Sequence, residues 1–164
     1  MDQYVGALIG LGFGYGWIVA GCLALERRYR YAALMLSGVV AAGTALLLLR
    51  AHGYAAPTPL VHARWIIYDV TVIFEVLAIA GSIGWLVRRR RTELIMPVVG
   101  IIAGLHFVGL WAATAYAQPG LLFAAIGMIG ACVLAIRSVG PSRVVLAGLG
   151  CGGVLWLAAV SVLV

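Results

Sequence analysis

Six long apolar stretches, separated by short polar segments, account for most of the chain. They cover approximately residues 5–25, 32–49, 65–87, 95–116, 120–136 and 144–164. A helix rises ~1.5 Å per residue, so about 20 apolar residues cross a hydrocarbon layer ~30 Å thick. The pattern therefore predicts an all-α integral membrane protein with six transmembrane helices, formed by residues 1–164 as a single membrane domain.

The third stretch, residues 65–87, contains two acids, Asp69 and Glu75. By residue count, Glu75 lies about half-way across, whereas Asp69 lies about one turn from one end. A charged side chain near the bilayer centre costs ~3 kcal/mol or more, so such a residue indicates a functional site. Asp69 lies roughly 120° around the helix from Glu75. Spacings of 4, 3, 4, 3 and 4 residues define one polar stripe, which consists of Arg64, Tyr68, Thr71, Glu75, Ala78 and Ser82.

A histidine, His106, occupies the middle of the fourth stretch. It lies 12 residues after Leu94, and Glu75 lies 13 residues before Arg88, where the short turn between the two stretches begins. Helices joined by a short turn are usually antiparallel neighbours, so the two side chains fall at nearly equal depth. We predict that they approach each other, directly or through one water, with Tyr68 or Thr71 nearby.

Composition supports the membrane interpretation. Hydrophobic residues make up 65% of the 164 residues and charged residues only 10%, with a mean hydropathy of +1.13. A typical soluble domain has ~25% charged residues. The net charge of +6 would suggest a nucleic-acid partner for a soluble chain. Here the basic residues are all arginines that lie between apolar stretches, so we expect a lipid bilayer and no nucleic acid as the partner.

The arginines are distributed unequally between the two sides of the predicted membrane layout. Nine follow the first, third and fifth stretches, namely Arg27, Arg28, Arg30, Arg88, Arg89, Arg90, Arg91, Arg137 and Arg143. Only Arg50 and Arg64 lie on the other side. Because cytoplasmic loops carry the excess of positive charge, both termini are expected outside the cytoplasm.

The first and fourth stretches resemble each other. Residues 5–17 align without gaps to residues 99–111, with six identities in thirteen positions. A duplication would give two inverted three-helix repeats, residues 5–87 and 95–164, an arrangement typical of transporters. Glycine and leucine are common in this chain, so a chance match is the alternative.

Glycines recur at helical spacing in the first and last stretches, including Gly10, Gly14, Gly148 and Gly152. Small residues let helices approach closely, so we expect tight packing within the chain, and homo-oligomer formation through these helices is a further hypothesis. The three cysteines, Cys22, Cys132 and Cys151, lie in apolar stretches without a CxxC spacing and are interpreted as buried thiols. We predict no metal site, no cofactor and no catalytic nucleophile.

The segment from Arg91 to Phe107 carries two local motifs, Glu93-Leu94-Ile95 with Pro97 and the Gly-Leu-His-Phe run that ends at Phe107. It resembles a group of small, uncharacterised bacterial six-helix membrane proteins with a GLHF-type motif. That group usually continues with Leu-Pro, whereas this chain has Val108-Gly109. The resemblance implies a multi-pass protein of the bacterial cytoplasmic (inner) membrane and implies no activity.

A second resemblance concerns Arg64-Trp-Ile-Ile-Tyr-Asp-Val-Thr71, which is similar to the third helix of microbial rhodopsins. That family binds retinal through a lysine on a seventh helix. This chain contains no lysine, so a retinal Schiff base is excluded.

The polar residues favour one leading function, a small proton-linked transporter or channel-like protein for an unknown small molecule or ion. Its predicted site consists of Glu75 and His106 with Asp69, Tyr68, Thr71, Ser82 and Arg64. The alternatives are an intramembrane enzyme or sensor that binds a lipid or isoprenoid-like molecule, and a helper subunit of a membrane complex. In the last case Glu75 can simply hold the helices together. A transporter predicts paired openings, an enzyme a pocket that opens on one side, and a helper subunit a packed centre.

The arginine distribution makes a topological prediction. Single cysteines introduced at Thr92 and at Ala55 should react with a membrane-impermeant thiol reagent from opposite sides, with Thr92 on the cytoplasmic side. Reaction of both cysteines from the same side would contradict the six-helix layout.

Overall fold

The computed structural model describes residues 3–52, 62–114 and 118–161, and these residues form six long α-helices and one short 3-10 helix. In chain order they are α1 (Gln3–Leu23), α2 (Arg27–His52), α3 (His62–Arg88), η1 (Thr92–Leu94), α4 (Ile95–Ala113), α5 (Pro119–Arg137) and α6 (Pro141–Val160). All six α-helices are long and apolar enough to cross a membrane, which confirms the six predicted long apolar helices.

Helix ends differ from the apolar boundaries by a few residues. Helix α2 begins at Arg27, five residues before the apolar stretch starts, because arginine and tyrosine do not interrupt a helix. Helices α5 and α6 each begin with proline, whose missing N–H has no helical acceptor in the first turn. Gly140 precedes α6 with a φ of 62°, a left-handed conformation that glycine adopts without steric cost.

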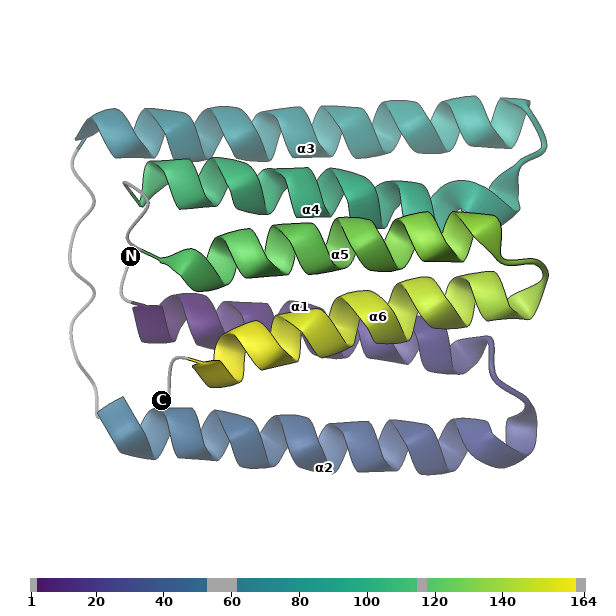
Figure 1. Ribbon diagram of the computed structural model, residues 1–164, viewed down its shortest axis with the longest axis horizontal. Helices are drawn as coiled ribbons and strands as arrows, with labels where there is room; N and C mark the ends of the chain where they lie inside the picture. The colour runs from purple at the N-terminus through teal and green to yellow at the C-terminus, as the bar shows by residue number, and fades with distance from the viewer. Residues whose placement is uncertain (1–2, 53–61, 115–117, 162–164) are drawn as a thin grey trace.

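The helices do not pack in chain order. Their neighbour order is α3, α4, α5, α6, α1 and α2, and α4 also contacts α6 (Figure 1). Helices α1, α4, α5 and α6 form a four-helix core. Helix α2 packs mainly on α1 and helix α3 mainly on α4, so these two helices flank the core.

Glycines bring α1 and α6 into backbone contact. A Cβ added at Gly148 would clash with the backbone of Gly21, and one added at Gly152 would lie against Gly14. Close packing therefore requires glycine at these positions, and the predicted tight packing is confirmed at Gly14, Gly148 and Gly152. It is not found at Gly10, where a Cβ would meet no atom within 4 Å. Formation of a homo-oligomer stays a prediction.

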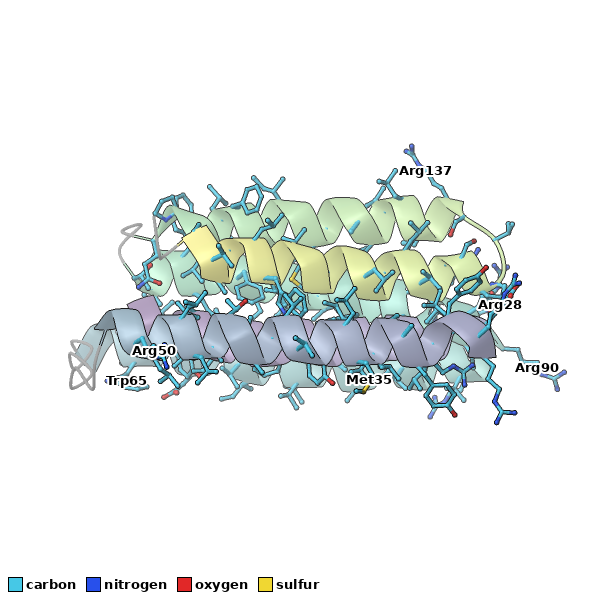
Figure 2. The ribbon with its side chains drawn as sticks, turned by 90° about the horizontal axis from the view of Figure 1, so that it is seen from below. Arg28, Met35, Arg50, Trp65, Arg90 and Arg137 are labelled. Atoms are coloured by element: carbon cyan, nitrogen blue, oxygen red, sulfur yellow. The ribbon has the colours of Figure 1, made fainter. Side chains whose placement is uncertain are left out.

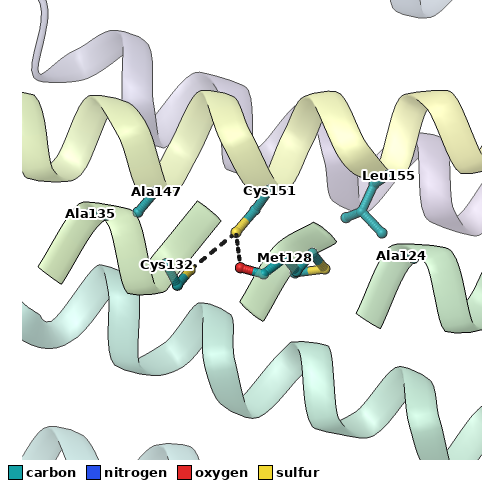
Figure 3. Packing of buried hydrophobic residues seen from close by; sticks show 7 residues of the cluster. All are labelled: Ala124, Met128, Cys132, Ala135, Ala147, Cys151 and Leu155. Carbon is teal, nitrogen blue, oxygen red and sulfur yellow. Dashed lines mark hydrogen bonds between the residues drawn. The ribbon is translucent and has the colours of Figure 1, made fainter. Parts of the chain in front are cut away.

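Sulfur-containing side chains fill the centre of the core. Met128, Cys132 and Cys151 are fully buried, and the two thiol sulfurs lie 3.3 Å apart between α5 and α6 (Figure 3). Helix α4 passes this cluster at Gly100, where a Cβ would clash with the Cys132 sulfur. All three cysteines are free and buried, as the sequence predicts.

The outer surface of the described residues is apolar along the helices and basic at one end. Large side chains such as Met35, which is 71% exposed, project from α2 and α3 into the space that lipid would fill. Arg28, Arg90 and Arg137 lie at one end of the bundle and Arg50 at the other (Figure 2). The arginines are thus segregated along the bundle axis, and the orientation in the membrane stays a prediction.

The two proposed repeats differ in packing. Helices α4, α5 and α6 contact one another, whereas in the first half only α1 and α2 form a substantial contact. An inverted duplication would place α2 against α3, as α5 lies against α6, but α2 and α3 make no substantial contact. The duplication therefore stays a prediction and gains no support from this packing.

The α1–α6 contact makes a stability prediction. Gly148→Ala should lower the free energy of unfolding by about 1–3 kcal/mol, because the new methyl group meets backbone that must move. Gly153→Ala, in the same helix but with open space around its Cβ, should be neutral or stabilising by up to about 1 kcal/mol. Thermal or denaturant unfolding in detergent tests the pair, and equal effects of the two variants would contradict the packing.

Candidate functional site

The polar stripe of α3 faces α4. Tyr68, Thr71, Glu75 and Ser82 are partly buried, whereas Asp69 is exposed on another face of the helix. Because α3 packs mainly on α4, these partly buried residues define the α3–α4 seam. Asp69 thus lies outside the stripe, as its angular distance from Glu75 predicts.

Glycine in α4 allows the two helices of the seam to approach closely. Thr71 donates a hydrogen bond from Oγ1 to the carbonyl oxygen of Tyr68 at 2.8 Å. Its methyl group packs where a Cβ of Gly109 would be, so any larger residue at position 109 would clash. Gly109 lies one turn from His106, and Thr71 lies one turn from Glu75. The Thr71–Gly109 contact therefore brings the two ionisable side chains together.

Glu75 and His106 meet in the seam, as predicted. The His106 Nδ1 atom lies 3.3 Å from the Glu75 Oε2 atom, with 13% of the His106 side chain and 24% of the Glu75 side chain exposed. The two atoms are close, but Nδ1 is buried and makes no aligned hydrogen bond within the described residues. A small rotation of either side chain would align them.

This contact has two chemically reasonable protonation states. Either Glu75 is ionised beside a protonated His106, or a neutral carboxyl group donates its proton to a neutral imidazole. The two states contain the same number of protons and differ only in where one proton lies. Adding a proton to the pair, or removing one, leaves a net charge in the membrane interior, so proton exchange at the pair requires water or a shift of the helices to stabilise that charge.

The other predicted site residues contribute less. Tyr68 packs edge-on against Trp65, with ring centroids 5.7 Å apart. Ser82 lies two turns from Glu75 toward the arginine-rich end and is partly buried. Asp69 makes no ion pair with another described residue, and the side chain of Arg64 lies outside the described part of the chain.

Two concave regions lie elsewhere. An apolar groove of about 620 Å³ runs between α1 and the first turns of α4. A cavity of about 320 Å³ lies among α1, α4, α5 and α6 near Gln118 and Ser161, with Phe107 in its lining. Neither is lined by Glu75 or His106. Neither of these two regions therefore provides the opening at the pair that a transporter requires.

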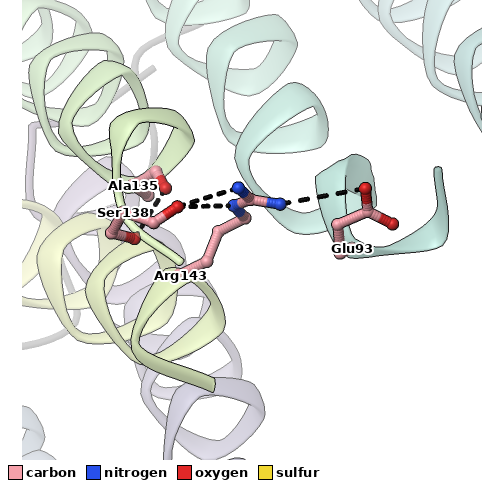
Figure 4. Close-up of polar contacts among 4 residues, drawn as sticks. All are labelled: Glu93, Ala135, Ser138 and Arg143. Carbon is pink, nitrogen blue, oxygen red and sulfur yellow. Dashed lines mark hydrogen bonds and ion pairs between the residues drawn. The ribbon is translucent and has the colours of Figure 1, made fainter. Parts of the chain in front are cut away.

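Sequence reasoning missed a polar contact that supports α4. Arg143 donates two hydrogen bonds to the carbonyl oxygen of Ser138, at 2.8 and 3.2 Å, and lies 3.9 Å from Glu93 (Figure 4). This contact joins the start of α6 to η1, which leads into α4. The sequence did contain a signal for this contact. Glu93 and Arg143 carry opposite charges and lie near the starts of the fourth and sixth helices, at the same predicted depth, where side chains can pair.

Comparison with protein-family models, with curated proteins and with solved structures finds no match to this chain. Fold and composition define the class, a multi-pass α-helical membrane protein. Within the described residues, no group of three or more histidine, cysteine, aspartate or glutamate side chains could hold a metal ion. The Glu75–His106 pair is thus the strongest candidate site.

The contact predicts that Glu75 and His106 are energetically coupled. In a double-mutant cycle, Glu75→Gln and His106→Gln should be non-additive by about 0.5–1.5 kcal/mol in the free energy of unfolding in detergent. The matched cycle of Asp69→Asn with His106→Gln should be additive within about 0.5 kcal/mol, since Asp69 is exposed elsewhere. Equal coupling in both cycles would contradict a specific contact.

Proposed function

We propose that the protein is a small proton-linked transporter in which the Glu75–His106 pair binds the proton. The observation that supports this function is the 3.3 Å approach of two ionisable side chains near the middle of two predicted membrane spans. Ionisable groups are rare at this depth and commonly form proton relays. The transported substrate, a small molecule or an ion, is unidentified.

The position of the pair suggests how proton binding would act on the protein. The pair lies in the α3–α4 seam, and α3 packs mainly on α4. Protonation of Glu75 beside a protonated His106 would remove the attraction between them and leave a buried cation. The seam would then be less stable, and α3 would shift against the four-helix core, which keeps its own packing. Such a shift would couple proton uptake to a change in access.

A helper subunit of a membrane complex is the second candidate. Two observations favour it: the packed centre formed by Met128, Cys132 and Cys151, and the separation of both concave regions from the pair. In that case a partner protein on the exposed side of α3 would complete the proton pathway. The intramembrane enzyme or lipid-binding sensor has no comparable support at the Glu75–His106 pair.

The proposed location is the cytoplasmic membrane of a bacterium, with both termini outside the cytoplasm. It is supported by the GLHF-type motif and by the arginine-rich end of the bundle. The proton would then move between the outer aqueous phase and the arginine-rich cytoplasmic side.

Proton flux into liposomes tests the transport proposal. Purified protein is reconstituted with an internal pH-sensitive dye, and a potassium diffusion potential drives proton entry. Wild-type protein should acidify the lumen well above protein-free liposomes, and Glu75→Gln should reduce the rate about tenfold or more because the amide cannot carry the proton. Asp69→Asn, which removes an acid outside the seam, should retain the wild-type rate.

Equal loss in Glu75→Gln and Asp69→Asn, or an unchanged rate in Glu75→Gln, would contradict proton transport through the pair. A wild-type rate equal to that of protein-free liposomes would contradict proton movement through the chain in the absence of a co-substrate and would favour the helper subunit. Melting temperatures of all three proteins in detergent show whether a lost rate reflects unfolding.

A further inference from the structure

The apolar groove between α1 and α4 is separate from the Glu75–His106 pair. Gly12, Gly16 and Ala20 form its α1 side, and Met96 and Val99 form its α4 side. Gly12 and Gly16 are exposed, and a Cβ at either position would meet no atom within 4 Å. Unlike Gly14 and Gly148, these two glycines are therefore not needed to pack α1 against its neighbours. They leave a hollow on the surface that faces lipid.

The size of the groove fits one lipid acyl chain. Its volume is about 620 Å³, within the roughly 300–1,000 Å³ of ligand-sized sites. Along α1 it extends from Leu8 to Ala20, which is ~18 Å at the helical rise. One leaflet of a ~30 Å hydrocarbon layer is ~15 Å thick. The part of the groove from Ala20 to Gly12, ~12 Å long, therefore matches one acyl chain that enters from the arginine-rich end, and the part toward Leu8 lies beyond the bilayer midplane.

Unpaired positive charge lies toward the end of the groove that Ala20 and Met96 line. Arg27 begins α2, the helix after α1, and Arg91 directly precedes η1 and α4, so arginines flank both helices of the groove. Among the described arginines at this end, only Arg28 and Arg143 contact a carboxylate. Positive side chains at the membrane surface attract anionic headgroups. The positive charge therefore complements an anionic phospholipid, whose headgroup carries a phosphate and no positively charged group.

We propose that this groove binds an anionic phospholipid. One acyl chain lies between α1 and α4 against Gly12 and Gly16, and the headgroup lies at the arginine-rich end near Arg27 and Arg91. The site stands independently of the transport proposal, because Glu75 and His106 do not line it.

Native mass spectrometry of the protein in detergent, titrated with phosphatidylglycerol or phosphatidylcholine of identical acyl chains, tests this site. The wild-type protein should bind phosphatidylglycerol more tightly. Gly16→Leu places its Cβ in open space and its side chain in the groove, so it should weaken phosphatidylglycerol binding about tenfold. Gly43→Leu changes an exposed glycine of α2 that also has open space around it and should bind like the wild type.

A second pair of variants tests the headgroup. Arg27→Gln combined with Arg91→Gln should reduce the affinity for phosphatidylglycerol to that for phosphatidylcholine. Arg50→Gln, at the opposite end of the bundle, should leave the preference unchanged. Equal loss in Arg50→Gln would show a general charge effect and would overturn the placement of the headgroup.

Three further results would overturn the proposal. They are equal binding of the two lipids by the wild type, unchanged binding in Gly16→Leu, and a wild-type dimer that Gly16→Leu converts to a monomer, since a second copy would then occupy the groove. If Gly16→Leu fails to fold, Val99→Trp fills the same groove from α4 and should give the same tenfold loss.

Discussion

A carboxylic acid in the middle of a membrane span constrains this protein more than any other group. An ionised Glu75 without a partner would cost ~3 kcal/mol or more, and the same holds for a protonated His106. Their 3.3 Å contact offsets this cost for both residues only while α3 stays docked on α4. The close approach of Thr71 to Gly109 provides that docking, so a small apolar contact and an ionisable pair depend on each other.

The remainder of the bundle provides a fixed support for this seam. Backbone contact between Gly21 and Gly148 holds α1 against α6, and the buried sulfur cluster joins α5 to α6. Helix α3 has one main neighbour and large exposed side chains on its other faces. A change in protonation would therefore act on a flanking helix and not on the four-helix core. This contrast between a packed core and a flanking helix is the physical basis of the proposed coupling.

Features that depend on helix length and membrane depth could be predicted from the sequence. Six apolar stretches of membrane-spanning length give six helices, and counting residues from a shared turn gives the contact of Glu75 with His106. The neighbour order could not be predicted, because in lipid the helices are apolar on all faces and the pattern does not mark an inward face. The Cys132–Cys151 contact and the groove depend on that order, so they could not be foreseen.

The central claim is that Glu75 exchanges a proton in direct contact with His106, and infrared difference spectroscopy of the protein in lipid bilayers tests it most directly. Spectra taken at stepwise pH should contain a carboxylic C=O band that is absent in Glu75→Gln. The band should shift in frequency and titrate at a different pH in His106→Gln, while Asp69→Asn leaves it unchanged. A Glu75 band that is identical with and without His106 would contradict the account.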